Sequence, residues 1–475
     1  MSKKGQSADL GTLPIGTLLR QQAIPASIGI LIMSVYGIVD TIFVGRWIGS
    51  LAIGAITVVL PITFFIASIG MSIGIGGASI ISRALGAGDK ERALQAFGNQ
   101  ISLTLFIALS VVTAGYFYQD EILQTFGGKG EILPYARTYF SIVLLGVPFL
   151  AWAMMSNNVI RALGQPKMAM YTLIVPAILN LFLDPILIVW FDMGMAGAAW
   201  ATTLGYIGSA VYTFWFFIRG ESEMQILWKN LALRADIVKE IFSIGGVTLA
   251  RQGTISVLAI VLNNTLFSYG GEMSVSVYGI INRIMFFANF PVLGIVQGFI
   301  PIAGFNFGAK KNNRVKEVIF KSIGWGTGIS FLIFIAIFLG AQQLSSIFTN
   351  DQILIDQTSP ALMAVFLATP LLVIQMIGSA YYQAIGKALP ALFLSLLKQG
   401  IFLIPLILIL PKYFGLYGVW YAFPIADVCT AIINFFFLRK AYHEMDNVAP
   451  VFADKEVQSG FTDEHVLDAD VDFEK

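Results

Sequence analysis

The sequence predicts an all-α integral membrane protein with twelve transmembrane helices in two six-helix bundles. Of the 475 residues, 57% are hydrophobic and 12% are charged, whereas charged residues make up about 25% of an average soluble domain. The chain also contains twelve apolar runs, each long enough to cross a bilayer as a helix of ~20 residues. These runs lie at 17–45, 51–82, 93–118, 132–160, 168–190, 195–218, 240–268, 275–305, 317–339, 354–384, 388–411 and 415–438. An internal duplication divides them into two sets of six.

The duplication is visible in three loop motifs that repeat at a nearly constant distance. LGAGDKERA at 85–93 is matched by FGAKKNNRV at 307–315, so Gly86 and Gly308 are 308 − 86 = 222 residues apart. RALGQP at 161–166 is matched by QAIGKAL at 383–389, also 222 apart, and MGMAGAAWA at 193–201 by FGLYGVWYA at 414–422, 221 apart. Because six is even, both bundles enter the membrane the same way round. A pseudo-two-fold axis along the membrane normal is therefore expected, with a cavity at the interface of the bundles.

Charge patterning sets the boundaries and the orientation. We expect a cytoplasmic N-terminal segment (1–16), an N-terminal six-helix bundle (17–219), a cytoplasmic linker (220–239), a C-terminal six-helix bundle (240–443) and an acidic cytoplasmic tail (444–475). The tail holds ten Asp or Glu and two Lys, 2 − 10 = −8, which leaves +1 + 8 = +9 on the remaining chain. The basic excess lies largely in alternate loops. This pattern places both termini in the cytoplasm of a multi-pass protein of the cell (inner) membrane.

The ends of the chain and its cysteine content add two expectations. The polar first 17 residues lack the apolar core of a cleavable signal peptide. The single cysteine, Cys429, lies in the last span and predicts no disulfide within a monomer.

Two carboxylates stand out inside the predicted spans. Asp40 interrupts the apolar run 24–44, and Asp184 lies in a later run with Asn180 one helical turn before it. A charge at that depth costs at least ~2.5–3.5 kcal/mol, so each should face a cavity, a partner or an ion. Asn180 and Asp184 share a helix face. The repeat aligns DTIF at Asp40 with NTLF at Asn264, so these carboxylates occur in the N-terminal half alone.

The surroundings of Asp184 suggest a site for a cation or a proton. Pro176 and Pro185 bracket it, and each proline frees a backbone carbonyl. Hard oxygen atoms of this kind are the ligands of Na⁺ sites in transporters. The Thr202 hydroxyl and the Ala198 carbonyl could complete such a site. The alternatives are a kinked helix whose polar groups pair across the bundle, and a Thr202 hydroxyl bonded to its own helix.

Other side chains of the first span suggest a path for substrate. Met33, Tyr36 and Asp40 fall at i, i+3 and i+7 on one stripe. A thioether, an aromatic ring and an acid would suit an amphipathic organic cation; ordinary helix packing is the alternative. Pro25 would allow this helix to bend.

The charges within the predicted spans of the second half include Arg251, Arg283, Lys398 and Asp427. Since unpaired charges are costly there, Asp427 is expected to neutralise Lys398 or Arg283.

These motifs together resemble the multidrug and toxic compound extrusion (MATE) transporters from Thr17 to about Tyr442. The landmarks are VDTIFVGRWIG (39–49), the loop glycines of both halves and RALGQP. The one-sided acid pattern is similar to the prokaryotic branch named after DNA-damage-inducible protein F. In that branch a cation site joins an Asp, an Asn-x-x-x-Asp and a Thr, which correspond to Asp40, Asn180, Asp184 and Thr202. The resemblance implies alternating access, bending at Pro25 coupled to protonation, and export of amphipathic, often cationic compounds driven by H⁺ or Na⁺.

The remaining function classes fit the sequence less well. An enzyme is not expected, because the only histidines, His443 and His465, lie outside the spans and no metal set or Ser-His pair can form within them. A channel would need a ring of acids or a repeated filter. A major-facilitator antiporter would need a fuller loop motif than Gly86 and Asp89–Arg92 provide. A lipid-linked oligosaccharide or lipid flippase of the same wider superfamily stays open as the alternative. We expect a monomer with a small-molecule substrate, a lipid surround, no nucleic-acid partner and no cofactor besides the coupling ion.

Overall fold

The computed structural model describes residues 6–219 and 223–447, and within these ranges it contains helices and no strands. The first half comprises η1 (Gln6–Gly11), α1 (Ile15–Trp47), α2 (Ser50–Gly86), α3 (Lys90–Phe117), α4 (Gln119–Thr125), α5 (Ile132–Ala162), α6 (Pro166–Asp184), η2 (Pro185–Trp190) and α7 (Gly194–Ile218). The second half comprises η3 (Trp228–Asn230), α8 (Ala235–Gly308), α9 (Asn312–Ser346), α10 (Gln352–Phe366), η4 (Thr369–Leu371), α11 (Leu372–Ala384), α12 (Ala388–Leu396), η5 (Leu397–Leu403), α13 (Ile404–Ile409), α14 (Pro411–Phe414) and α15 (Leu416–Asn447).

The prediction of twelve spans is confirmed once α8 is divided in two. Eleven helices of the described chain are long and apolar enough to cross a membrane. One of them is α8, whose 74 residues would extend about 110 Å, enough for two crossings. Its backbone breaks at Gly271, where φ is 65° and ψ is −162°. That conformation is open to glycine and strained for other residues, so Gly271 separates the seventh and eighth spans.

Two spans contain a short wide π turn that is not apparent from the sequence. These turns are η2 at Pro185–Trp190 and η5 at Leu397–Leu403. A proline stands beside each turn, Pro185 at the start of η2 and Pro405 just after η5. Proline has no backbone N–H to donate to the carbonyl four residues earlier, and its ring clashes with that carbonyl. The wider π turn gives the ring room. The two turns interrupt corresponding spans of the two halves, the fifth and the eleventh.

Some expected boundaries differ from the helices observed. The second bundle begins at Ala235 rather than at residue 240, and α15 continues to Asn447, so that it includes Glu444 and Asp446. Residues 1–5 of the N-terminal segment, 220–222 of the linker and 448–475 of the tail lie outside the described residues.

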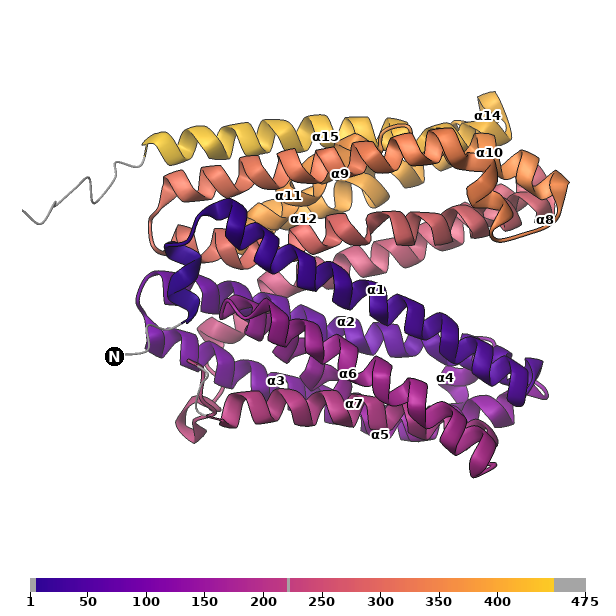
Figure 1. The fold of residues 1–475 in the computed structure, drawn as a ribbon, viewed down its shortest axis with the longest axis horizontal. Coiled ribbons are helices and arrows are strands. Elements are labelled where there is room, and N and C mark those ends of the chain that lie inside the picture. Colours follow the sequence, from indigo (N-terminus) through magenta and orange to yellow (C-terminus); the bar gives the residue numbers. More distant parts are fainter. Residues whose placement is uncertain (1–5, 220–222, 448–475) are drawn as a thin grey trace, which may run out of the picture.

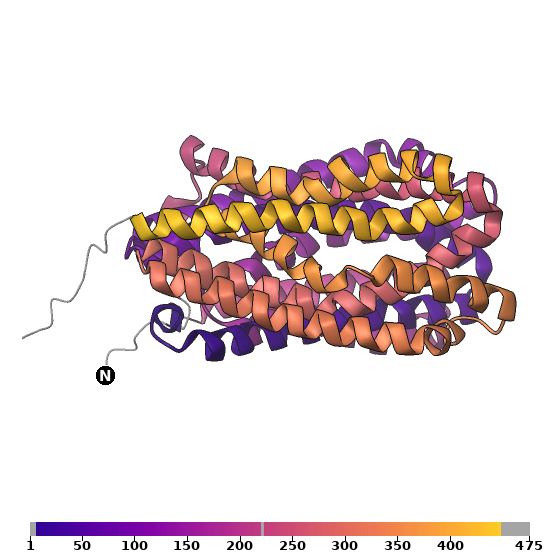
Figure 2. The same cartoon turned by 90° about the horizontal axis from the view of Figure 1, so that it is seen from above.

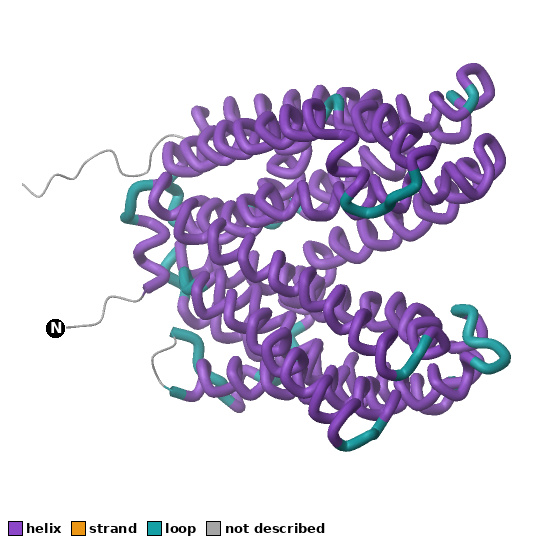
Figure 3. The backbone as a smooth tube through the Cα atoms, turned by 45° about the vertical axis from the view of Figure 1, so that its right-hand side comes forward, coloured by secondary structure: helices purple, strands orange, loops and turns teal. Residues whose placement is uncertain are grey.

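The helices form two groups that meet at one end of the molecule. Helices α1–α7 make one group and α8–α15 the other, and their ribbons diverge away from the end where the N-terminus is marked (Figure 1). The long helices of both groups run along the same axis (Figure 2), and the divergence is visible again from a third side (Figure 3). We call the end near Gln6 and Asn447, where the groups meet, the closed end.

Contacts at the closed end are reciprocal between the repeats. A Cβ atom on Gly86 would overlap the carbonyl oxygen of Phe305, and one on Gly308 would overlap that of Arg83. The repeat converts one contact into the other: Gly86 corresponds to Gly308 (308 − 86 = 222), and Arg83 corresponds to Phe305 (305 − 83 = 222). Exchange of partners is the signature of a two-fold, self-complementary interface. The pseudo-two-fold axis therefore passes between α2 and the end of α8.

A second pair of contacts obeys the same rule. A Cβ on Gly245 would meet the carbonyl oxygen of Ser72, and one on Gly294 would meet that of Ala23. Here 245 − 23 = 222 and 294 − 72 = 222. Backbones approach this closely only where side chains are small.

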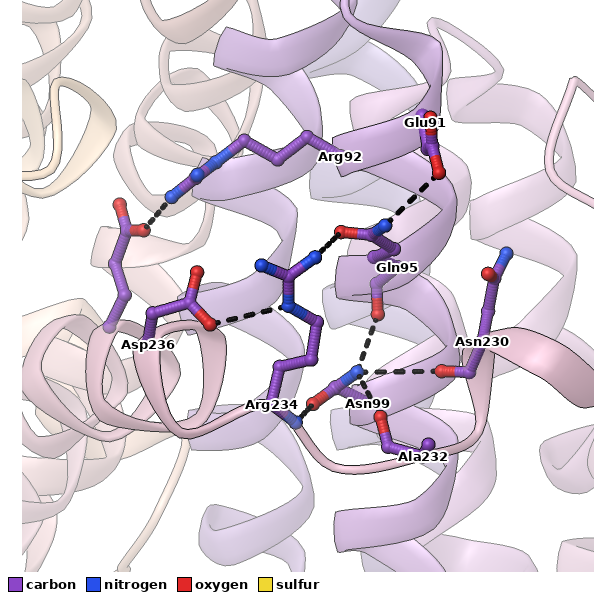
Figure 4. Close-up of polar contacts among 9 residues, drawn as sticks. Glu91, Arg92, Gln95, Asn99, Asn230, Ala232, Arg234 and Asp236 are labelled. Carbon is purple, nitrogen blue, oxygen red and sulfur yellow. Dashed lines mark hydrogen bonds and ion pairs between the residues drawn. The ribbon is translucent and has the colours of Figure 1, made fainter.

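The segment that joins the two halves is bound to α3 (Figure 4). The Asn99 side chain donates to the carbonyls of Ala232 at 3.1 Å and Asn230 at 3.4 Å, and accepts from Arg234 N at 2.7 Å. The Arg234 guanidinium also donates to the Gln95 side chain at 2.7 Å. The described part of the connection is thus part of the closed end.

Candidate cation and substrate site

Helices α1 and α6 bring together the two carboxylates that the sequence singled out. Asp40 is 8% exposed and Asp184 1% exposed, and their side chains are close enough to share a hydrogen bond. The two helices also pack closely elsewhere along their length, where a Cβ on Gly29 of α1 would lie 3.0 Å from Leu173 of α6. Asp184 is the last residue of α6, directly before the π turn η2.

Asn180 and Thr202 extend the site to α7. With its amide oriented to suit both neighbours, Asn180 donates to Asp184 Oδ2 at 2.6 Å and accepts from Thr202 N at 3.3 Å. The Thr202 hydroxyl lies 3.4 Å from the Tyr139 hydroxyl of α5. Ala198, one turn earlier on α7, is fully buried. Helices α1, α5, α6 and α7, all of the first half, therefore converge at this point.

The carboxylates lack the partners that would neutralise them. Asp40 Oδ1 and Asp184 Oδ1 are buried with no hydrogen-bond partner, and neither residue forms an ion pair with the residues the structure describes. Two adjacent carboxylates cannot both stay ionised in an apolar interior unless a proton or a cation lies between them. The two orphan oxygens mark where that proton or cation would bind.

Several oxygen atoms at the site are of the kind that bind a hard cation. Asp40, Asp184 and the Thr202 hydroxyl offer oxygen atoms, the ligand type that such cations prefer. The Asn180 amide fits the site in either orientation: its nitrogen can donate to Thr202 Oγ1 at 3.4 Å or, with the amide turned over, to Asp184 Oδ2 at 2.6 Å. In the first orientation its oxygen faces Asp184 and could join the ligands of a cation, and in the second its nitrogen donates to the Asp184 carboxylate.

The substrate-path residues lie on the same helix as Asp40. Tyr36 is half-buried and close enough to Asp40 to interact with it electrostatically. Met33 is 37% exposed. Pro25 is buried within α1, which continues through it as one helix from Ile15 to Trp47.

Two tyrosines lie at the site that were not predicted from the sequence. Tyr139 of α5 and Tyr206 of α7 both lie close enough to Asp40 for an electrostatic interaction. Tyr206 stands four residues after Thr202, on the same helix face, so the spacing was available as a signal. Nothing local in the sequence marks Tyr139, because the fold alone brings α5 beside α1.

Comparison with known proteins shows the family. The MatE family model matches residues 25–186 and 251–409, which together are more than half of the chain. The chain belongs to the MatE family. Its many apolar helices and its family together make it a multi-pass membrane protein.

Individual relatives agree with this assignment. The MatE chain is 28% identical over 420 residues to the multidrug export protein MepA of Staphylococcus aureus, covering 88% of this chain and 92% of that protein. Its fold is similar to a crystal structure of MATE in complex with MaL6 (TM-score 0.88, 24% identity, 94% of this chain and 100% of that chain). It is also similar to the outward-facing conformation of a multidrug resistance MATE family transporter of the MOP superfamily (TM-score 0.87, 24% identity, 94% of this chain and 99% of that chain).

The C-terminal half of this MatE protein has a charge pair of a different kind. Lys398 Nζ lies 2.6 Å from Asp427 Oδ1, which confirms that Asp427 neutralises Lys398. Gln375 Nε2 donates to the same carboxylate oxygen and to the Asp427 carbonyl, both at 3.0 Å. Arg283, the other expected partner, is exposed. This pair is complete without an added ion.

Proposed function

We propose that this MatE protein is a multidrug efflux antiporter. In this proposal it exports amphipathic, often cationic organic compounds by alternating access, in exchange for H⁺ or Na⁺. The observation that carries the proposal is the buried pair Asp40–Asp184, whose two orphan oxygens need a proton or a cation. The name of the S. aureus relative, a multidrug export protein, supports the substrate class.

Helix α1 offers a physical link between the ion site and the interface of the halves. Toward the closed end, a Cβ on Gly298 of α8 would overlap Gln22, and Ala23 is in contact with Gly294. At its other end α1 carries Asp40, in contact with α6. Pro25 lies within the first of these regions, since Ser27 also contacts Gly294, and it removes the hydrogen bond that would reach Gln21. We propose that a change of charge at Asp40 alters how α1 packs and bends at Pro25, and so shifts the balance between two states of the transporter.

The orientation follows from the same proposal. The closed end, with both termini, would face the cytoplasm, and the substrate would leave from the opposite side. Opening at the closed end would then require the reciprocal contacts of Gly86 and Gly308 to separate.

We propose a proton as the coupling ion, because Asp40 and Asp184 are close enough to share a hydrogen bond and two carboxyl groups can share one only when one of them holds a proton. Purified protein in liposomes would be loaded with a fluorescent organic cation, and a pH gradient or a Na⁺ gradient would be imposed separately. We expect the pH gradient to drive transport in the absence of Na⁺. A strict requirement for Na⁺ would show instead that the two carboxylates hold a cation between them. Movement of a labelled lipid, with no transport of the organic cation under either gradient, would favour the flippase alternative instead.

A further inference from the structure

A cavity at the closed end is lined by both halves. It has a volume of about 600 Å³ and lies among the end of α2, the start of α3, the α8–α9 turn, the α11–α12 turn and the last turns of α15. Its charged lining residues are Arg83, Arg92, Lys310 and Lys387, with Asp89 and Glu444 as the acids. Basic residues therefore outnumber acids in the lining by four to two. The ion site described above does not use this cavity.

The basic groups of the cavity are only partly neutralised. Arg83 and Arg92 share one carboxylate, that of Glu240, at 2.7 and 2.9 Å. Lys387 reaches Glu444 only at 3.8 Å, and Lys310 has no ion pair with the residues the structure describes. Asp89 caps α3 by accepting from Arg92 N. A net positive charge remains.

The chain beyond Asn447 has the opposite charge. Its 475 − 447 = 28 residues hold eight Asp or Glu and two Lys, a net charge of 2 − 8 = −6. They also hold three phenylalanines, Phe452, Phe461 and Phe473, which could contact the apolar part of the cavity wall.

The helix that leads into this tail already borders the cavity. Ala441, Glu444 and Met445 of α15 form part of the wall, so the chain leaves α15 beside it. A chain of 28 residues with random-coil dimensions would span roughly 30 Å on average, which is enough to reach back to the cavity. Acidic residues in the last turn of α15 already pair with lysines of the second half: Asp446 with Lys316 and Glu444 with Lys387.

We propose that the acidic tail, residues 448–475, docks in this cavity and restrains opening of the closed end. Arg83 and Arg92 belong to the first half and Lys310 and Lys387 to the second, so a tail bound to all four would bridge the halves. Because the tail is tethered beside the site, its effective concentration is in the millimolar range and weak contacts suffice. The restraint on transport rests on the proposed function, whereas docking itself does not.

Docking is tested without transport. In a Cys429→Ser background, Ala87→Cys places a thiol at an exposed position of the cavity wall, and its reaction with a charged maleimide is timed. The comparison protein carries the full tail with its eight acids changed to Asn or Gln. A tail docked nine-tenths of the time would slow labelling about tenfold, because only the undocked fraction reacts. Neutralising the tail, or adding about 0.5 M NaCl, should remove that protection.

A matched control and a second measurement complete the test. Trp228→Cys, exposed on η3, should label at the same rate with either tail. Equal labelling of Ala87→Cys with either tail at low salt would overturn docking, and so would protection that survives neutralisation. Protection that appears only when inorganic phosphate is added would assign the cavity to a free anion instead. If docking restrains opening, the neutralised tail should speed transport in liposomes; an unchanged rate with clear protection would overturn the restraint alone.

Discussion

The two halves share one helical scaffold, but their buried carboxylates differ in whether they have a counter-charge. In the first half, Asp40 and Asp184 lie together and each keeps an oxygen that has no hydrogen-bond partner among the described residues. In the second half, Asp427 is satisfied by Lys398 and Gln375. A carboxylate that is already neutralised has no reason to exchange ions, whereas two facing carboxylates must take up a proton or a cation. Duplication of a scaffold therefore does not imply duplication of its chemistry.

The largest effect should come from removing a charge of the first half. Asp40→Asn cannot exchange a proton, so gradient-driven transport of an organic cation in liposomes should fall to the level of protein-free vesicles. The matched control replaces the pair of the second half by apolar residues, Lys398→Met with Asp427→Leu. Such replacements of ion pairs are often tolerated, so the control should retain at least half of the transport. Wild-type rates for Asp40→Asn at equal protein content would refute the role of Asp40.

The sequence predicted the scaffold better than the surroundings of the site. Each span is a continuous apolar run and each repeated motif is a short stretch of sequence, so both can be recognised without knowing which helices touch. All twelve spans were predicted for this reason. The i, i+4 spacing likewise placed Asn180 and Asp184 on one face. Contacts between distant helices carry no such local signal. Tyr139 was missed for that reason, and the π turns were missed because hydropathy does not distinguish them from α-helix.

Loss of a carboxylate should lower the free energy of unfolding in the second half but not in the first. Asp427→Asn leaves Lys398 without its counter-charge, which should lower the free energy of unfolding by about 2–3 kcal/mol, less than for a fully buried pair because the lysine is partly exposed. Asp184→Asn removes one of two facing acids, keeps an acceptor for Asn180, and should leave stability unchanged or raise it by about 1 kcal/mol. Thermal unfolding in detergent at neutral pH measures both. A clear loss of stability in Asp184→Asn would show that its carboxylate already has a stabilising partner.

The reciprocal contacts at the closed end predict equal effects in the two halves. Gly308→Ala would press a methyl group onto the Arg83 backbone, and Gly86→Ala would do the same to Phe305. Overlap with a backbone cannot be relieved by a rotamer change and should cost the closed state about 1–3 kcal/mol, which is a 5- to 150-fold shift toward opening.

The shift is measured as a distance between spin labels at Lys90→Cys and Asn313→Cys, in a Cys429→Ser background. Gly246→Ala is the control, because no neighbouring atom in the described part of the chain lies within 4 Å of its Cβ position. An effect at Gly308 without one at Gly86 would show that the two-fold contact does not close the transporter.

The smallest effect concerns substrate contact at Tyr36. Tyr36 lies one helical turn before Asp40 on α1 and interacts with it electrostatically, so its ring could face the flat surface of an aromatic cation whose charge approaches the carboxylate. A desolvated cation–π contact contributes up to ~2 kcal/mol, so its loss would weaken apparent affinity ~30-fold at most. Tyr36→Ala should therefore raise the half-saturating concentration of aromatic cations more than that of aliphatic ones. Tyr36→Phe keeps the ring and should preserve the preference. Equal changes for both substrate classes would mean that Tyr36 supports the packing of α1 and that the substrate binds elsewhere.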